Sequence, residues 1–330
     1  MANFLIFLKR IFIVGFLIFL LSGVAAQPEG KPGASSSGEL TIYLIPSNVT
    51  YNWSSPHALY CSLIRNYIRN IFKKDCYLLG HAFMELESPS DSLVVMTGMR
   101  STCRDQQKQM LFEENYGLAI LGTGLEGKLQ TREELECQLG KYSKKGKLAF
   151  IRILINEKAA LKMGEFYNRY KSRLDSIGNS SCYGGAYWPR YYGEGSGCSA
   201  FVISFLDIAG ILREEFDVWR VDISIPLDLI GGPYNPGQEV TLKDVKKSRE
   251  WADNSVQTAM NHEPFWIFDP TMMSEWVKEV YKSSESVEGM TVIPVKINKA
   301  KGIEIDARNV TVPDESIFMP RKQPSIFIKE

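Results

Sequence analysis

The chain has 330 residues, of which 45% are apolar, and it carries 38 basic and 38 acidic side chains, so its formal net charge is zero. This length and composition are typical of a globular protein with one large domain or two small ones. The basic residues are scattered among acids, and the pairs Lys144-Lys145 and Lys246-Lys247 are too short for a polyanion-binding patch, which argues against a nucleic-acid partner.

The start of the chain, residues 1–26, is predicted to be a signal peptide. A basic pair, Lys9 and Arg10, precedes an apolar stretch and then small residues that end at Ala26, which is the order of a secretory leader. We expect cleavage near Ala26 and export to the periplasm or the exterior, with no membrane span left after cleavage. An uncleaved anchor is the alternative, because residues 4–8 extend the apolar character upstream.

Three further regions follow the leader. Residues 27–38 are rich in Pro, Gly and Ser and are predicted to be a flexible linker. Over residues 39–312, short β-branched or aromatic runs alternate with longer helical patterns, which predicts an α+β domain. Residues 313–330 contain three prolines and are predicted to be an irregular tail. The predicted strands are 41–45, 77–86, 93–99, 148–155, 218–225 and 291–297, and the predicted helices are 56–73, 156–174, 198–212 and 270–281.

Two local motifs refine these elements. The turn-forming residues 87–91 predict that the strands on either side of them pair as a hairpin. Thr131 and Glu134 have the spacing of a capping box, which predicts a short helix after Thr131. The segments 106–148 and 226–269 otherwise read as insertions without a functional motif.

Cys198 is the most informative residue, because it lies where a glycine-rich turn becomes an apolar helix. Unpaired amide N–H groups and the positive end of the helix dipole favour thiolate over thiol at such a position. The same amides can receive an oxyanion. Gly195 and Gly197 let the backbone turn sharply and let a substrate carbonyl approach. The pattern therefore predicts a nucleophilic thiol.

The six cysteines of an exported chain allow two interpretations. An even number of cysteines and an oxidising compartment favour three disulfides, with Cys182 and Cys198 as one pair. A chain of this length does not need disulfides for its stability, however, and Cys198 stands at a helix start. If Cys198 is free, at least one further thiol is free as well, and Cys103 or Cys137 is the expected one.

A thiol nucleophile needs a base, and the chain has three histidines. His81 is the preferred base, because on a strand it shares a face with Glu85 and can face the start of the cysteine helix. His262 is the second choice, with Asp269 as the residue that would orient it. His57 precedes a predicted helix and is expected to be a surface or capping residue.

Two segments together carry a family resemblance. Gly80-His81-Ala82 on a strand, followed more than a hundred residues later by Gly-Cys-Ser-Ala-Phe at 197–201, resembles the circularly permuted NlpC-type branch of the papain-like cysteine hydrolases. In that branch the histidine precedes the cysteine. The resemblance covers about residues 77–225. It implies a central antiparallel sheet packed against the cysteine helix, with Gly80 leaving room for the helix, and chemistry at an amide, thioester or ester carbonyl.

In that family a third polar residue on the next strand orients the histidine. Thr97 is the only uncharged polar side chain which that strand offers before Arg100. A hairpin that turns near Pro89 would put Thr97 about opposite His81. Glu85 is the alternative, because a carboxylate holds the imidazole tautomer better than a hydroxyl does. The third role therefore stays open between Thr97 and Glu85.

The segment before Cys198 packs aromatic residues and glycines without helical or strand periodicity. The hydroxyl of Tyr183 could join an oxyanion hole, while Trp188 and Tyr191 could line a substrate groove or simply cover the end of the sheet. Arg190 could grip an acidic group of the substrate. The residues expected to contact substrate are Tyr183, Trp188, Arg190, Tyr191, Tyr192 and Ser199.

Other classes of site have no support in the sequence. There is no Cys-x-x-Cys pair, no His-Glu-x-x-His motif and no phosphate-binding glycine loop, so we expect neither a metal nor a cofactor. The expected function is an exported thiol hydrolase, with cell-wall peptides as the first substrate class and lipid or protein acyl groups, handled by an acyltransferase or thioesterase, as the second. A non-catalytic binding module on the same fold is the competing interpretation.

Overall fold

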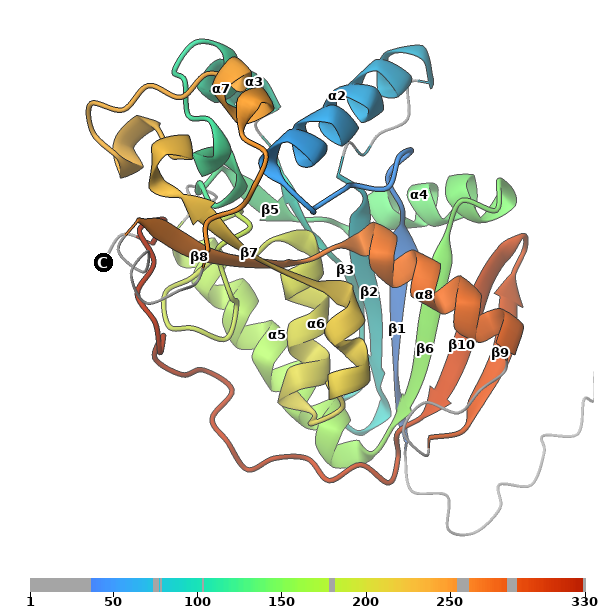
Figure 1. Ribbon diagram of the computed structural model, residues 1–330. Helices are drawn as coiled ribbons and strands as arrows, with labels where there is room; N and C mark the ends of the chain where they lie inside the picture. The colour runs from blue at the N-terminus through green and yellow to red at the C-terminus, as the bar shows by residue number, and fades with distance from the viewer. Residues whose placement is uncertain are drawn as a thin grey trace, which may run out of the picture. The chain divides into compact units, whose positions relative to one another are not determined.

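Figure 1 shows the computed structural model of the chain, which describes residues 37–73, 77, 79–102, 104–177, 182–253, 261–283 and 290–328. Residues 36–330 form one compact unit. The predicted signal peptide lies outside the described residues, as do Cys76, Cys103 and most of the predicted linker. Among the described residues, no helix is both long enough and apolar enough to cross a bilayer.

A six-stranded mixed sheet forms the centre of an α+β fold, with the strand order β3-β2-β1-β6-β10-β9. The predicted hairpin is confirmed as β2 and β3, and every neighbouring pair is antiparallel except β6 and β10, which run parallel. The strands are β1 (Gly38–Ile45), β2 (His81–Ser88), β3 (Leu93–Thr97), β6 (Ala149–Ile155), β9 (Val292–Ile297) and β10 (Ala300–Asp306).

The expectation of a wholly antiparallel sheet is therefore wrong at one pair. The missed strand is β10, whose sequence Ala-Lys-Gly-Ile-Glu-Ile-Asp alternates apolar and charged residues as a half-buried strand does. Gly302 lies against the Phe150 ring on β6, where an added Cβ would be only 2.5 Å from ring carbons. A glycine inside a short strand masks the period-2 pattern, because it supplies no side chain to count.

Helices cover both faces of the sheet. On one face lie α5, α6 and α8, and on the other lies α4, while α2 packs against α7 (Figure 1). The predicted limits of α2 and the predicted capping box before α4 are both confirmed. The helices are α2 (Pro56–Lys73), α3 (Arg104–Phe112), α4 (Arg132–Lys144), α5 (Glu157–Ile177), α6 (Cys198–Ile208), α7 (Leu242–Lys247) and α8 (Pro270–Ser283).

Smaller elements flank the main sheet. Two further ribbons pair antiparallel, β4 (Met99–Ser101) with β5 (Gly127–Leu129) and β7 (Arg220–Pro226) with β8 (His262–Phe268). Short 3-10 turns occur at Pro89–Asp91, Leu118–Leu121, Glu214–Trp219, Leu227–Leu229 and Gly232–Tyr234.

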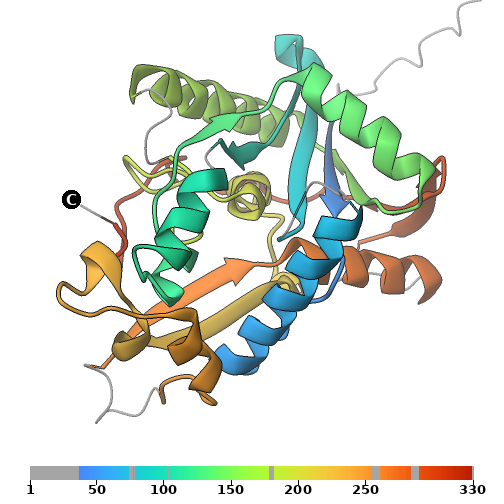
Figure 2. The same ribbon diagram turned by 90° about the horizontal axis from the view of Figure 1, so that it is seen from above.

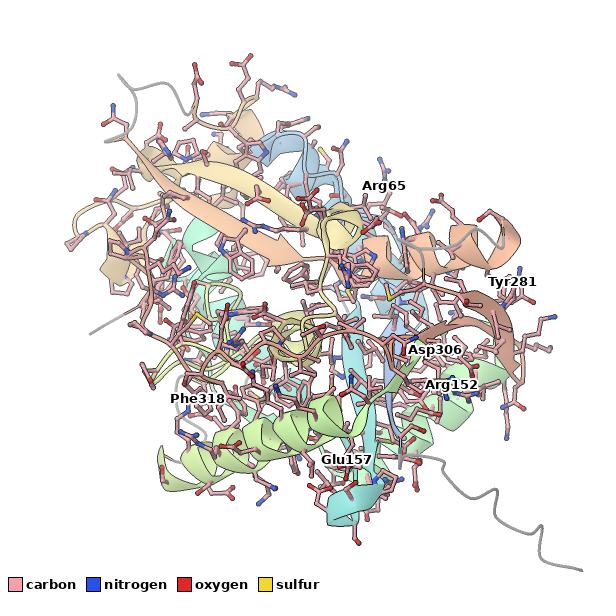
Figure 3. The ribbon with its side chains drawn as sticks, turned by 90° about the horizontal axis from the view of Figure 1, so that it is seen from below. Arg65, Arg152, Glu157, Tyr281, Asp306 and Phe318 are labelled. Atoms are coloured by element: carbon pink, nitrogen blue, oxygen red, sulfur yellow. The ribbon has the colours of Figure 1, made fainter. Side chains whose placement is uncertain are left out.

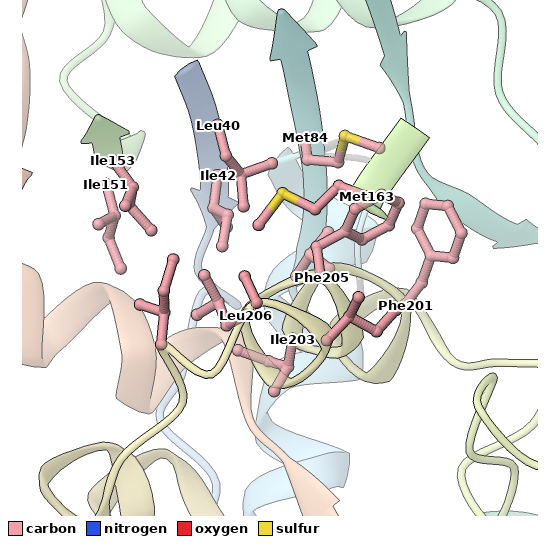
Figure 4. Packing of buried hydrophobic residues seen from close by; sticks show 14 of the residues in the cluster. Leu40, Ile42, Met84, Ile151, Ile153, Met163, Phe201, Ile203, Phe205 and Leu206 are labelled. Carbon is pink, nitrogen blue, oxygen red and sulfur yellow. The ribbon is translucent and has the colours of Figure 1, made fainter. Parts of the chain in front are cut away.

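Helix α6 is apolar around its whole circumference because it is buried on every side. Ten of its residues are buried, and Phe201 and Phe205 are fully so. Figure 4 shows its side chains packed against Leu40 and Ile42 of β1. Each such side chain contributes about 1.5–3 kcal/mol through removal from water. The helix that begins at Cys198 is therefore fixed by the main core.

The direction of α6 places Cys198 at a definite end of the sheet. The Phe166 and Phe205 rings are 5.2 Å apart and those of Tyr170 and Phe201 are 5.4 Å apart, so α5 and α6 run antiparallel. Because α5 follows β6 directly, it starts at the end where β6 finishes. The C-terminal end of α6 therefore lies at that end, and Cys198 lies toward the opposite end, where β2 begins.

Candidate functional site

The cysteine predicted to be the nucleophile is a free thiol at the start of α6. Cys198 is 9% exposed and follows Gly197, whose carbonyl accepts a hydrogen bond of 3.0 Å from the Phe201 amide. Cys182 is also free, so the predicted Cys182–Cys198 disulfide is wrong. Cys61 and Cys137 are free as well, which excludes the framework of three disulfides. A thiol at a helix start meets the first requirement of a nucleophile.

The loop before the helix turns on a glycine that no other residue could replace. An added Cβ at Gly195 would lie 2.0 Å from the carbonyl oxygen of Cys182, and Ser196 donates a hydrogen bond of 2.9 Å to that oxygen. Gly197 similarly faces the carbonyl oxygen of Gly184, at 3.3 Å from an added Cβ. The two glycines therefore bring the chain back against residues 182–184, a close approach that the sequence analysis did not predict.

Tyr183 is brought directly to the thiol by this turn. Its hydroxyl hydrogen-bonds to the side chain of Cys198 and also accepts from the Cys198 backbone N–H. Burial raises the pKa of Tyr183 well above its usual value, and the neighbouring Cys198 side chain raises it further. Tyr183 therefore stays a neutral hydrogen-bond donor. Its hydroxyl also accepts from the Cys198 backbone N–H, which is the group that the sequence analysis expected to bind an oxyanion.

His81 is the first residue of β2 and is 2% exposed. Its Nε2 lies 2.6 Å from Oε1 of Gln130, and its ring stacks on Tyr77 with a centroid distance of 4.3 Å. A carboxamide oxygen accepts, so Nε2 carries the proton and Nδ1 keeps its lone pair. Gln130 thus selects the tautomer that a general base needs.

Burial also fixes the charge of this imidazole. Desolvation lowers the pKa of His81 to about 4, the hydrogen bond to Gln130 opposes this shift, and the charge of Arg100 adds to it. The ring is therefore neutral at physiological pH. A neutral imidazole can accept a proton from a thiol, whereas an imidazolium cannot.

The two candidate residues lie at the same end of the sheet, but no hydrogen bond joins them in the described part of the chain. Along β2, Ala82 packs with α6 in the main core, whereas Phe83 packs with Tyr43 on the α4 side. His81 shares the strand face of Phe83 and Glu85, which is not the face that carries the cysteine helix, so the expectation that His81 faces the start of that helix is wrong. Tyr77 stacks on His81, and its hydroxyl donates a hydrogen bond of 2.5 Å to Oε1 of Gln138 on α4, so the surroundings of the imidazole belong to the α4 side of the sheet.

Neither residue proposed to orient His81 does so. Thr97 pairs with Met84 and not with His81, and its hydroxyl donates a hydrogen bond of 3.1 Å to the carbonyl oxygen of Gln130. The expected register is wrong because the ladder begins with Ser88 opposite Leu93 and β3 ends at Thr97. Thr97 therefore positions Gln130, which in turn binds the histidine.

Glu85 forms an ion pair with Arg132 and does not contact His81 in the described part of the chain. Its Oε1 lies 2.9 Å from Nη1 of Arg132, and its other oxygen accepts a hydrogen bond of 3.4 Å from the Tyr43 hydroxyl. The role predicted for Glu85 therefore belongs to Gln130, which sequence reasoning missed. The only local signal was its place immediately before the Thr131 capping box, and nothing in that motif points toward a histidine 49 residues away.

Gly80 does not serve the purpose that the sequence suggested. Its φ of +76° lies in the left-handed region, and an added Cβ would meet the carbonyl oxygen of Ile45 at 3.0 Å and Pro270 at 3.3 Å. Pro270 opens α8, so the helix that approaches here is α8 rather than the cysteine helix. The glycine is required by the backbone conformation and by this close approach.

The aromatic residues predicted to line a groove are divided between covering and exposed positions. Trp188 is buried against Trp266, with ring centroids 5.5 Å apart, and covers the core. Tyr191 stacks under the guanidinium of Arg321 at 4.8 Å, while Tyr192 is 63% exposed. Ser199 is buried, with its hydroxyl 3.9 Å from the Cys198 sulfur.

Arg190 is not placed to grip a substrate. Its side chain is 3% exposed and its Nη1 lies 2.5 Å from Oδ2 of Asp207, on α6. Its other nitrogens donate to the carbonyl oxygens of Ser316 and Ile317, at 2.8 and 3.3 Å. Arg190 therefore joins the loop before Cys198 to the cysteine helix and to the C-terminal segment.

The C-terminal segment is irregular, as predicted, but it is part of the core. Arg321 forms a bidentate pair with Glu194, at 2.6 and 2.7 Å, and Glu194 also accepts from the Trp188 amide at 3.0 Å. Phe318 and Phe327 are 7% and 2% exposed. Residues 313–328 therefore hold the loop that precedes Cys198.

The second-choice histidine is separated from its proposed partner. His262 begins β8, and Asp269 follows the end of the same strand, so about 20 Å of extended chain lies between them. Asp269 instead accepts hydrogen bonds from the Thr271 amide at 2.7 Å and from the Trp53 ring at 3.0 Å, and it caps α8. His57 is the second residue of α2 and is half-buried, with Nδ1 2.5 Å from the carbonyl oxygen of Lys246.

Within the described residues, no group of three or more His, Cys, Asp or Glu side chains could hold a metal ion. A cavity of about 170 Å³ is lined by Ile45, Ser47, Tyr77, Tyr142 and Lys147 among others, and its Tyr77 ring is the one that stacks on His81. It is large enough for a few waters or one small group. Comparisons of the chain with protein-family models, curated proteins and solved structures found no match.

Proposed function

We propose that the protein is an exported thiol hydrolase of the papain-like type, with Cys198 as nucleophile, His81 as base and Gln130 as the residue that orients the base. The single observation that carries this proposal is the free Cys198 thiol at the start of a buried helix, at the same end of the sheet as an imidazole held in its base tautomer. These are the groups that acyl transfer to sulfur requires.

The reaction begins when a substrate carbonyl reaches the start of α6. The carbonyl oxygen replaces the Tyr183 hydroxyl at the Cys198 amide, which frees the Cys198 thiol. Transfer of the thiol proton to Nδ1 of His81 then requires the imidazole to move from the α4 side of the sheet toward the start of α6. The thiolate attacks the carbonyl carbon, and the oxyanion receives hydrogen bonds from the Cys198 N–H and from Tyr183. The imidazolium protonates the leaving amine or alkoxide, and water then hydrolyses the thioester.

The substrate class follows from the expected export of the chain. A secretory leader at residues 1–26 would deliver the enzyme to the periplasm or the exterior, where cell-wall peptides offer amide bonds. Acyl esters of lipids or proteins are the second class, which a thioester intermediate would serve equally well.

A binding module is the second candidate, because one observation favours it. No hydrogen bond joins His81 to Cys198 in the described part of the chain, and His81 leaves β2 on the face that α4 covers. A protein that binds a peptide at Tyr183 without turnover would keep this arrangement.

The deciding experiment measures labelling of the full chain by an electrophilic acyl probe, together with product formation from peptidoglycan fragments, short peptides and acyl esters. Cys198→Ala should remove the rapid labelling and leave only the slow labelling of the exposed Cys137 thiol, whereas the matched control Cys182→Ala, which removes a buried thiol from the same loop, should retain the rapid labelling. His81→Ala should slow labelling about a hundredfold or more, and His262→Ala should not. Equal labelling of wild type and Cys198→Ala would refute the enzyme and leave the binding module.

A further inference from the structure

Lysines that are scattered in the sequence meet at one corner of the fold. The turn between α4 and β6 carries Lys144 and Lys145, and the turn between β9 and β10 carries Lys299. The Lys299 amide donates a hydrogen bond of 3.2 Å to the carbonyl oxygen of Ser143, and an added Cβ at Gly146 would lie 3.5 Å from Lys299 Cβ. Figures 1 and 2 show the end of α4 beside the β9–β10 turn.

The same corner extends along the edge of the sheet to α8. Lys296 and Lys301 lie opposite each other on β9 and β10, and both ammonium groups lie over the Tyr281 ring, at 5.9 and 5.3 Å. Tyr281 is labelled in Figure 3 at this edge. Lys282 follows on the last turn of α8. We call Lys144, Lys145, Lys282, Lys296, Lys299 and Lys301 the lysine corner.

The lysine corner is a cluster of positive charges that no neighbouring carboxylate of the described residues neutralises through an ion pair. All six side chains belong to exposed residues, and none of them pairs with a carboxylate of the described residues. Burial lowers the pKa of the neighbouring Lys278, Glu275 opposes this, and the ammonium groups of Lys301 and Lys282 lower it further. A chain with no net charge therefore presents one strongly basic surface.

We infer that the lysine corner docks the protein on an anionic membrane surface. Two adjacent turns and the edge strand form a projecting corner, which can meet a plane of phosphate headgroups, and lysines act there as point charges without a need for bidentate geometry. On β9, Pro294 is exposed and shares a strand face with Lys296, so some apolar surface lies on the same side of the sheet as these charges. The predicted leader brings the chain to a membrane during export.

A nucleic acid fits this surface less well. Non-specific binding of single strands uses exposed aromatic faces on which bases stack. Tyr281 is half-buried, and two ammonium groups already lie over its ring. The docking surface is at the end of the sheet where β6 and β10 begin, which is also the end where His81 begins β2. Docking there would bring the candidate site close to the lipid surface.

The test measures co-sedimentation of the full chain with phosphatidylcholine vesicles and with vesicles that also contain phosphatidylglycerol. The triple variant Lys144→Glu, Lys145→Glu, Lys299→Glu is compared with the control Lys246→Glu, Lys247→Glu, Lys322→Glu, which makes the same change of net charge with exposed lysines elsewhere. Binding to phosphatidylcholine alone measures the contribution of the N-terminal apolar segment, which all three proteins share.

Wild type and control should bind the anionic vesicles at least tenfold more tightly than the corner variant does, since each lysine near such a surface contributes to attraction. Salt at about 0.5 M should remove the difference. Circular dichroism and thermal unfolding confirm that all three proteins are folded. Equal binding of the corner variant and wild type, equal loss in the control, or tighter binding of a single-stranded oligonucleotide at the same salt would overturn the inference. None of these outcomes depends on thiol activity, so they do not test the proposed hydrolase.

Discussion

The buried imidazole makes the stability of the fold depend on pH in a way that one substitution should remove. His81 has its pKa lowered from 6.5 to about 4, first by burial and then by the charge of Arg100, against the opposing bond to Gln130. At pH values above the unfolded-state pKa of 6.5, the imidazole is neutral in both the folded and the unfolded chain, so His81 contributes no pH dependence there. As the pH falls below 6.5, the unfolded chain binds a proton that the folded chain does not bind, and stability is lost until the pH reaches the folded value.

The size of this loss of stability follows from the pKa values of His81 in the folded and unfolded states. Between about pH 7 and about pH 4.5, the difference in proton binding at this one ring removes about 2 kcal/mol of the free energy of unfolding. His81→Gln keeps an amide that can reach the Gln130 carbonyl group but cannot titrate. Its free energy of unfolding should therefore fall by about 2 kcal/mol less than that of wild type over this range.

Urea denaturation at the two pH values measures this difference directly. Cys198→Ala serves as the control, because it alters the site and leaves the imidazole in place, so it should retain the pH dependence of wild type. If His81→Gln and wild type lose the same stability between the two pH values, then the folded chain protonates His81 freely. That result would refute both the buried position of the ring and its assignment as a neutral base.

Three further substitutions test the contacts that position the site. Gln130→Leu leaves the buried imidazole without its partner and should lower the free energy of unfolding by about 1–3 kcal/mol while slowing probe labelling of the thiol. Arg190→Ala breaks a nearly buried ion pair and should cost about 2–4 kcal/mol in urea denaturation, whereas the exposed pair of Arg169 should cost less than about 1. Phe201→Ala should lower stability by about 3–5 kcal/mol in the same assay, and Phe112→Ala, at an exposed ring, by no more than about 0.5; similar costs would contradict the packing of α6.

The sequence predicted those elements whose signals are local. The limits of α2, the capping box at Thr131 and the start of α6 at Cys198 all follow from side-chain periodicity or from residues within one helical turn. The hairpin of β2 and β3 was also predictable, because a turn cluster separates two β-rich runs. Each of these features is decided by neighbours in the chain.

The missed features depend on partners that are distant in the sequence. Gln130 binds His81 across 49 positions, and nothing near either residue specifies the other. The predicted register of Thr97 failed because a shift of a few residues at the turn moves every cross-strand pair. Arg190 was predicted to bind a substrate because nothing near it in the sequence shows that its partner Asp207 lies on α6. A pattern of residue types indicates which chemistry the side chains can perform, but not which side chains contact one another in the fold.

The C-terminal segment has a consequence for the order in which the protein is made. A ribosome releases Cys198 and its loop long before it reaches Arg321, which secures Glu194, or Phe327, which fills the core. Until translation ends, the nascent chain therefore carries the thiol without the contacts that shape its surroundings. A premature stop codon before Met319 would remove the Arg321–Glu194 pair and the hydrogen bonds that Met319 makes with Arg190 and Tyr192, and so leave the loop before Cys198 without these contacts.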